Sequence, residues 1–142
     1  RPTLIKPNRN ETERLLGRRL EGPDAGVRGA RQLLAEGPEV VVVSSGADGA
    51  ALVTARQSWW ATPPDIQPGS TVGAGDSMVA GFAVALSRGL SLSDALRLAT
   101  AAGTATAGLD GTQVCSGDAV EAVLPQVRIA EVSILGEGGD AR

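Results

Sequence analysis

Residues 70–77 read Ser-Thr-Val-Gly-Ala-Gly-Asp-Ser, and this stretch decides the fold because a helical apolar pattern starts within it. Met78, Phe82 and Leu86 recur every four residues after it, and Gly89 ends the pattern. The spacing predicts a largely buried helix. Its N-terminus would carry N–H groups without intrahelical partners and a partial positive charge, and the small residues would let an anion approach them.

Asp76 stands at this predicted helix start and is an unusual choice for simple anion binding. A carboxylate beside an anion site suits a general base that takes a proton from a hydroxyl attacking a phosphoryl group. The backbone N–H groups would then stabilise the charge that builds up on the transferred group. The alternative is an ordinary helix start in which Asp76 only complements the helix dipole. The stretch matches neither the P-loop nor the Gly-x-Gly-x-x-Gly pattern.

Predicted strands and helices alternate along the rest of the chain. Four consecutive valines, residues 40–43, predict a strand that is buried on both faces, as in the centre of a parallel sheet. Further strands are predicted at 3–5, 50–55, 57–62 and 127–132, and further helices at 10–16, 23–36, 91–103 and 118–124. This alternation predicts an α/β fold with helices packed on a mostly parallel sheet.

Composition excludes several classes of function. The net charge is −3, from 13 basic and 16 acidic residues, and no basic stripe suggests a nucleic-acid partner. No apolar run approaches the ~18 residues that a membrane span needs. The chain has no histidine, so a Ser-His-Asp triad and a histidine base are excluded. Cys115 is the only cysteine, which predicts no disulfide framework and a reducing, cytoplasmic setting.

Four motifs together resemble the ribokinase-like, pfkB-type carbohydrate kinases. Residues 71–76 resemble the second signature of that family, and residues 6–11 (Lys-Pro-Asn-Arg-Asn-Glu) resemble its Lys-Pro-Asn plus Asn-x-x-Glu segment. Residues 44–49 resemble its Ser-x-Gly-x-x-Gly nucleotide loop, and 101–103 with 111–112 resemble the helix and loop that enclose the adenine. The motifs follow the family's order and comparable spacing over nearly the whole chain.

The resemblance implies a role for each matching residue. Asp76 would be the catalytic base, and the anion hole would be formed by the backbone of Gly73, Ala74 and Gly75. The residues implied in ATP binding are Lys6, Asn8, Ser44, Gly46, Gly49, Thr71, Gly103 and Gly111. Asn8 and Glu11 would hold Mg²⁺, through water, which suits a cation that dehydrates reluctantly.

Each of these residues also has a simpler interpretation without the resemblance. Lys6 would be an ordinary surface lysine, although it stands alone among 12 arginines. Asn8 and Glu11 would be a polar loop residue and an acid in the first turn of a helix. Gly46 and Gly49 would be hairpin glycines.

For the fold, the resemblance implies the C-terminal portion of a three-layer α/β/α sandwich. Residues 1–135 would be the ATP-binding and catalytic portion of a sugar kinase domain, and residues 136–142 a disordered tail. The chain opens with Arg1 directly in an apolar run, so we expect a cut inside a domain. The missing half would carry the sugar-binding residues and a lid, and the parent protein could be a homodimer.

The flanks of residues 73–76 resemble the phosphosugar branch of the family. This implies ATP-dependent phosphorylation of a fructose monophosphate to fructose 1,6-bisphosphate, with fructose 1-phosphate as the favoured substrate. Fructose 6-phosphate and tagatose 6-phosphate stay open as alternative substrates. A non-catalytic nucleotide-binding fragment is the alternative of another class, and we expect the isolated chain to be inactive. The expected partners are ATP and a small sugar phosphate, with neither nucleic acid nor membrane.

Overall fold

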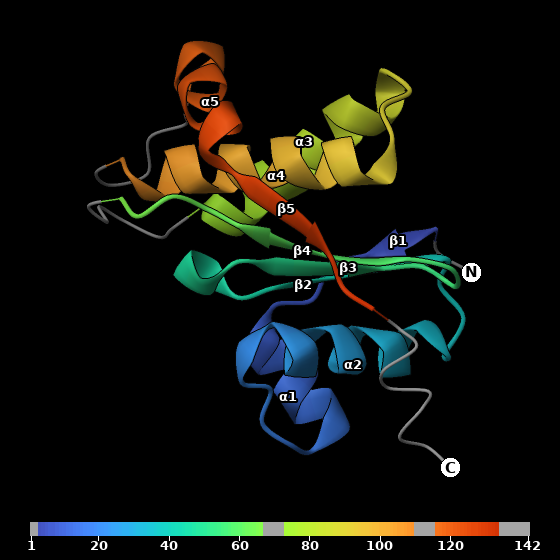
Figure 1. The fold of residues 1–142 in the computed structure, drawn as a ribbon. Helices are drawn as coiled ribbons and strands as arrows, with labels where there is room; N and C mark the ends of the chain where they lie inside the picture. Colours follow the sequence, from blue (N-terminus) through green and yellow to red (C-terminus); the bar gives the residue numbers. More distant parts are fainter. Residues whose placement is uncertain (1–2, 67–72, 110–115, 134–142) are drawn as a thin grey trace. The chain divides into compact units, whose positions relative to one another are not determined.

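The computed structural model describes residues 3–66, 73–109 and 116–133 (Figure 1). Its elements, in chain order, are β1 (Leu4–Ile5), α1 (Arg9–Leu16), α2 (Gly22–Leu34), β2 (Val40–Ser44), the 3₁₀ helix η1 (Gly46–Asp48), β3 (Ala50–Val53), β4 (Ser58–Thr62), α3 (Ala74–Ser87), α4 (Leu92–Ala107), α5 (Gly117–Val123), the 3₁₀ helix η2 (Leu124–Gln126) and β5 (Arg128–Glu131). The described residues up to Trp60 and from Ala130 onward form one compact unit, and those of Ala61–Ile129 form a second. The alternation of strands and helices predicted for the α/β class is confirmed. The predicted tail, residues 136–142, lies outside the described residues.

The strands form one five-stranded sheet in the order β1-β2-β3-β4-β5. β1 pairs with β2 in parallel, with Leu4 opposite Val40. β2 pairs with β3 in antiparallel, with Val41 opposite Val53. The prediction that β2 lies between parallel neighbours is therefore correct for β1 and wrong for β3. The reason is the connection: the few residues between β2 and β3 allow a tight return but not the crossover that a parallel neighbour requires.

The four valines of β2 are buried on both faces of the strand, as predicted. Val41, Val42 and Val43 are 0% exposed, and Val40 is 7% exposed. Because side chains alternate along a strand, Val41 and Val43 share one face and Val40 and Val42 the other. Full burial of such a side chain contributes about 1.5–3 kcal/mol relative to exposure.

In the first unit, α1 and α2 cover one face of β1 to β3 (Figure 1). The core between α2 and the sheet consists of Val27, Ala30, Leu33, Val41, Val43, Ala51, Val53 and Trp60. Gly26 lets α2 approach Trp60, because a Cβ there would lie 2.9 Å from the indole Cζ3. Trp60 is thus a packing residue of this core.

In the second unit, α3 and α4 pack closely side by side. A Cβ on Gly81 would lie 2.7 Å from the Cα of Ala99, and a Cβ on Gly103 would lie 3.3 Å from the carbonyl oxygen of Ala74. Contacts advance along α4 while they recede along α3, so the two helices run antiparallel. Small residues at both contacts allow the backbones to approach.

The prediction of a largely buried helix after residue 75 is correct for one face of α3 only. Met78 and Phe82 are buried, at 6% and 3% exposure. Val79 and Leu86 are 52% and 43% exposed. Their four-residue spacing places Met78 and Phe82 on the face toward α4, whereas Val79 lies outside it. The sequence pattern gave no sign of this difference because apolar residues surround the helix on all sides.

Helix ends follow their local sequence. α1 ends at Gly17, which takes the left-handed conformation with φ of 69°, and α4 begins after Ser91, whose side chain accepts from the Asp94 amide. None of the helices in the described ranges is long and apolar enough to cross a membrane.

Replacing Gly81 by alanine should destabilise the second unit. The added methyl group would overlap the backbone of Ala99, and overpacking of this kind costs about 1–3 kcal/mol. Thermal unfolding followed by circular dichroism should show a lower Tm for Gly81→Ala. Gly117→Ala is the matched control, because a Cβ at that helical glycine meets no atom within 4 Å. An unchanged Tm for Gly81→Ala would contradict the close packing of α3 and α4.

Candidate active site

The ends of β1 and β2 bring three of the predicted nucleotide-binding residues together. An isolated parallel bridge joins Asn8 to Ser44, and the amide of Ser44 donates to the carbonyl oxygen of Pro7 at 3.2 Å. The Lys6 Nζ donates to the Ser44 Oγ at 3.4 Å. Residues 38 positions apart in the sequence thus meet because two parallel strands end at the same edge.

Asn8 and Glu11 form a reciprocal capping box at the start of α1. The Glu11 amide donates to the Asn8 Oδ1 at 2.8 Å, and the Asn8 amide donates to the Glu11 Oε1 at 2.8 Å. The buried Thr12 hydroxyl donates to the Asn8 carbonyl oxygen at 2.9 Å. Both predicted magnesium residues therefore have a structural role that the sequence interpretation did not assign to them, although Asn-x-x-Glu is a form of the capping-box signature.

The predicted nucleotide loop, residues 44–49, is a tight turn that contains η1. Gly46 and Gly49 have φ of 56° and 126°. Residues other than glycine adopt such positive φ angles only with backbone strain. The Ser45 amide donates to the Gly49 carbonyl oxygen at 2.8 Å and closes the turn. Both glycines are thus required by the backbone, which is the simpler interpretation of them.

An ion pair not predicted from the sequence joins this loop to α1. The Arg9 guanidinium lies 3.1 Å from the Asp48 carboxylate. Both side chains are partly exposed, at 40% and 70%, so the pair contributes less than about 1 kcal/mol. No local pattern could reveal it, since the partners are 39 residues apart. The pair links the first residue of α1 to the end of η1.

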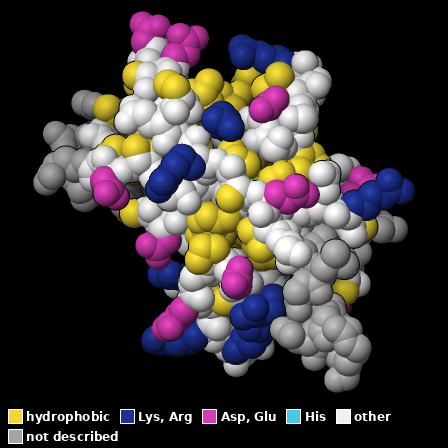
Figure 2. Space-filling model, viewed as in Figure 1, with side chains coloured by type: hydrophobic (Ala, Val, Ile, Leu, Met, Phe, Trp, Pro, Cys, Tyr) yellow, Lys and Arg dark blue, Asp and Glu magenta, His cyan; other side chains and the backbone are white. Residues whose placement is uncertain are grey.

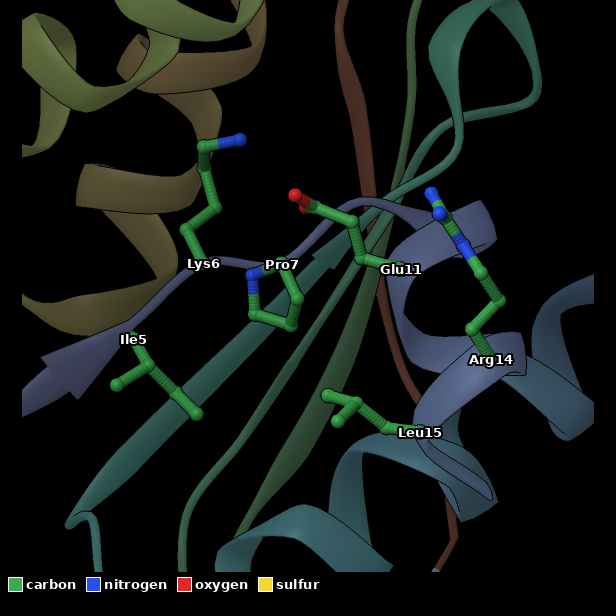
Figure 3. A pocket seen from close by; sticks show the side chains of 6 residues that line it. All are labelled: Ile5, Lys6, Pro7, Glu11, Arg14 and Leu15. Carbon is green, nitrogen blue, oxygen red and sulfur yellow. The ribbon is translucent and has the colours of Figure 1, made fainter. Parts of the chain in front are cut away.

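An open pocket of about 640 Å³ lies beside the end of β1 (Figure 3). Its lining consists of Ile5, Lys6, Pro7, Glu11, Arg14 and Leu15. Figure 3 shows the polar ends of Lys6, Glu11 and Arg14 turned toward the same side of the pocket, with Ile5 and Leu15 along its other side. The pocket thus combines two cations, one carboxylate and an apolar wall. Arg14 and Leu15 were not predicted as site residues.

Glu11 is the residue that best fits a hydrated cation in this pocket. One of its oxygens accepts from the Asn8 amide, and the other makes no hydrogen bond within the described part of the chain. Mg²⁺ binds proteins through one or two carboxylates and keeps several waters, so a single outward carboxylate oxygen is compatible with it. Among the residues that the structure describes, no group of three or more His, Cys, Asp or Glu could hold a metal ion.

The start of α3 carries the predicted base and anion hole. Gly73 is the N-cap residue and takes the left-handed conformation with φ of 85° and ψ of −6°. The first hydrogen bond of the helix runs from the Ser77 amide to the Gly73 carbonyl oxygen at 2.9 Å. The amides of Ala74, Gly75 and Asp76 therefore have no acceptor within the helix.

The Asp76 side chain is exposed in the first turn of α3. Its carboxylate makes no hydrogen bond or ion pair with any other described residue. The turn below it is braced by α4, because the Thr106 hydroxyl donates to the Ser77 Oγ at 2.7 Å. An accessible carboxylate on a supported helix start can accept a proton from a bound hydroxyl.

Three predicted site residues remain, namely Gly103, Thr71 and Gly111. Gly103 lies in α4, where its lack of a side chain is explained by the close approach of Ala74. Thr71 and Gly111 lie outside the described residues. The described candidate residues thus form two sets: Lys6, Asn8, Glu11, Ser44, Gly46 and Gly49 in the first unit, and Gly73 to Asp76 with Gly103 in the second.

The comparisons with known proteins agree with this fold and these motifs. Residues 1–119 match the model of the pfkB family carbohydrate kinases. The chain is 48% identical over 80 residues to 1-phosphofructokinase of Escherichia coli K12, a match that covers 56% of this chain and 26% of that enzyme. The chain therefore spans about a quarter of the length of the curated relatives it matches.

Two solved structures show the same architecture. Phosphofructokinase-2 from Escherichia coli, in complex with substrates and products, aligns with a TM-score of 0.79 and 37% identity over 87% of this chain and 40% of that chain. Ribokinase from Thermotoga maritima aligns with a TM-score of 0.76 and 29% identity over 87% of this chain and 42% of that one. The fold is thus that of the ribokinase-like sugar kinases. The chain belongs to the pfkB family of carbohydrate kinases.

The capping role of Asn8 can be separated from any role in metal binding. Asn8→Ala should lower the free energy of unfolding by about 0.5–2 kcal/mol, because the Glu11 amide loses its acceptor. Asn8→Ser should keep the cap and stay close to the wild type. Urea unfolding measures both variants, and equal losses for alanine and serine would contradict the capping role.

Proposed function

We propose that this chain supplies the nucleotide-binding and catalytic-base residues of a kinase that phosphorylates a fructose monophosphate, with fructose 1-phosphate as the favoured substrate. The observation that carries the proposal is the start of α3, where the exposed Asp76 follows three small residues at a helix N-terminus capped by Gly73 in the left-handed conformation. The family match supports the reaction class, and similarity to 1-phosphofructokinases supports the substrate.

In this proposal Asp76 is the general base. Its carboxylate accepts the proton of the acceptor hydroxyl as that oxygen bonds to the γ-phosphorus of ATP, while the bond from this phosphorus to the bridging oxygen breaks and ADP leaves. The backbone N–H groups of Gly73, Ala74 and Gly75 stabilise the charge on the transferred phosphoryl oxygens. Backbone donors suit this task because they are already oriented before the reaction begins.

The first unit would bind the nucleotide phosphates. Lys6 provides a positive charge next to Ser44 at the ends of β1 and β2, and the turn of residues 44–49 offers backbone groups beside it. Glu11 would hold hydrated Mg²⁺ with its outward carboxylate oxygen, and Asn8 would keep that carboxylate in place through the capping box. When bound, Mg²⁺ neutralises charge on the ATP phosphates.

Sequence identity favours fructose 1-phosphate over fructose 6-phosphate as the substrate. The identity to 1-phosphofructokinase of Escherichia coli is 48% over the matched region, against 37% to phosphofructokinase-2 over a longer alignment. Phosphorylation of fructose 1-phosphate and phosphorylation of fructose 6-phosphate would both give fructose 1,6-bisphosphate. Tagatose 6-phosphate stays the third possibility.

On the face of the described chain that Figure 2 shows, basic side chains are interspersed with acidic and apolar ones rather than joined into a continuous stripe. A small sugar phosphate does not require such a stripe, so this face is compatible with the proposed substrate.

Asp76→Asn tests the base. Assayed in the full-length enzyme with MgATP and fructose 1-phosphate, this variant should lose at least about 10²-fold in kcat, with little change in KM for ATP, because a base acts in the transition state. Asp94→Asn is the matched control, since Asp94 is an exposed acid in the first turn of α4. Near-normal turnover of Asp76→Asn would remove Asp76 from the mechanism.

The substrate is decided in the same assay. Comparing kcat/KM for fructose 1-phosphate, fructose 6-phosphate and tagatose 6-phosphate should give the highest value for the first. No turnover of any of the three by a folded protein that binds MgATP would favour the non-catalytic nucleotide-binding alternative.

Lys6→Ala tests the nucleotide site. Calorimetric titration of MgATP into this chain should give a Kd at least about tenfold higher for the variant, since a hydrogen bond to a charged group contributes about 1.5–3 kcal/mol. Arg28→Ala, which removes an exposed cation from α2, is the control and should bind like the wild type. Equal affinity of Lys6→Ala and the wild type for MgATP would mean that Lys6 does not contact the ATP phosphates.

A further inference from the structure

The buried side chain of Thr106 in α4 contacts the first turn of α3. Thr106 is 3% exposed, and it lies near the end of α4. Its hydroxyl donates to the Ser77 Oγ at 2.7 Å, and its methyl carbon Cγ2 lies 3.8 Å from the position of a Cβ on Gly73. One side chain thus hydrogen-bonds to Ser77, the fourth residue of α3, and has its methyl group beside Gly73, the N-cap residue.

Asp76 lies between Gly73 and Ser77 in the sequence. The segment from Gly73 to Ser77 is one turn, and it is closed by the bond from the Ser77 amide to the Gly73 carbonyl oxygen at 2.9 Å. A helix end normally frays, because its first amides lack partners. The hydrogen bond from Thr106 to Ser77 opposes this fraying, so the carboxylate stands on a supported backbone although it is itself exposed.

The contact at Thr106 continues the close packing farther along the helices. Gly103, one turn earlier in α4, approaches the Ala74 carbonyl oxygen, and Ala99 approaches Gly81. The backbones are therefore held at a short separation that leaves Thr106 little room to move. A side chain whose rotamer is fixed by packing is a suitable support for a reactive group.

We propose that Thr106 is a positioning residue, which holds the first turn of α3 and with it Asp76 through the hydrogen bond to Ser77. This inference rests on the proposed role of Asp76 as the base. Thr106 touches neither substrate nor nucleotide in this proposal. It acts only by restricting where the carboxylate can be, and a misplacement of about 1 Å can lower a rate about 10²-fold.

Two substitutions at the same position separate the hydroxyl from the methyl group. Thr106→Val keeps the methyl group beside Gly73 and removes the donor, whereas Thr106→Ser keeps the donor and removes the methyl group. Thr100→Val is the matched control: Thr100 is also buried in α4, at 5% exposure, and its hydroxyl has no hydrogen-bond partner among the described residues. Its removal leaves no partner unsatisfied.

The first readout needs no enzymatic activity. Amide hydrogen exchange in this chain, followed by NMR, should be about fivefold faster at Ser77 and Met78 in Thr106→Val, a change that matches one net hydrogen bond. Thr106→Ser and Thr100→Val should leave these amides near the wild-type rate. The Thr12 amide of α1, which donates to the Asn8 carbonyl oxygen at 2.9 Å, is the internal reference.

The second readout is kinetic and uses the full-length enzyme. Thr106→Val should lower kcat about tenfold with KM for ATP within about twofold, and Thr106→Ser should restore most of the loss. Ser77→Ala should reproduce the effect of Thr106→Val, and the double variant should be no worse than either, because both remove the same bond.

Each outcome decides the proposal. Unchanged exchange at Ser77 and Met78 in both Thr106→Val and Ser77→Ala would overturn it. Faster exchange with unchanged kcat would also overturn it, because the bond would then be structural only. If the wild-type enzyme phosphorylates none of the three phosphosugars, the proposed function fails, while the exchange rates still decide whether Thr106 holds the turn.

Discussion

The parallel pairing of β1 with β2 is the constraint on which the first unit depends. Only two residues of β1 pair with β2, and the bridge from Asn8 to Ser44 continues the pairing beyond the strands. This short ladder places the residue that caps α1 beside the residue that opens the turn of residues 44–49. The burial of the β2 valines on both faces stabilises the strand that β1 pairs with, because it removes apolar surface from water.

The second unit depends on a different physical condition, the short distance between two helix backbones. Glycine at 81 and at 103 leaves space that the facing backbone fills. The same closeness brings Thr106 to the start of α3. The first amides of α3 have no acceptor within the helix, so they do not themselves hold this turn in place.

Several candidate residues have a structural role that coincides with their proposed chemical one. Asn8 and Glu11 cap α1, Gly46 and Gly49 satisfy positive φ angles, and Gly103 allows close packing. The two kinds of role are compatible: the capping box fixes the carboxylate that would face magnesium. They have different consequences, however, since loss of a cap lowers stability whereas loss of a ligand lowers affinity. Asp76 differs from them, because its side chain makes no hydrogen bond or ion pair with another described residue and its structural role is limited to complementing the dipole of α3.

Local signals in the sequence were sufficient to predict the individual helices and strands. Four valines in a row, a glycine after Leu16 and a serine before Leu92 mark a buried strand, a helix end and a helix start, and the structure confirms all three. The motifs of residues 6–11, 44–49 and 71–76 also identified the family, which the comparisons confirm. Such signals depend on neighbours in the chain, so no tertiary information is required to interpret them.

What only the tertiary structure decided are the contacts between distant residues. The sequence by itself determined the α/β class, the family and the positions of its motifs. It did not determine the antiparallel return of β3, the exposed face of α3, the ion pair of Arg9 with Asp48 or the bond from Thr106 to Ser77. The physical reason is that periodicity and capping act over a few residues, whereas side-chain partners and burial depend on which surfaces the folded chain brings together.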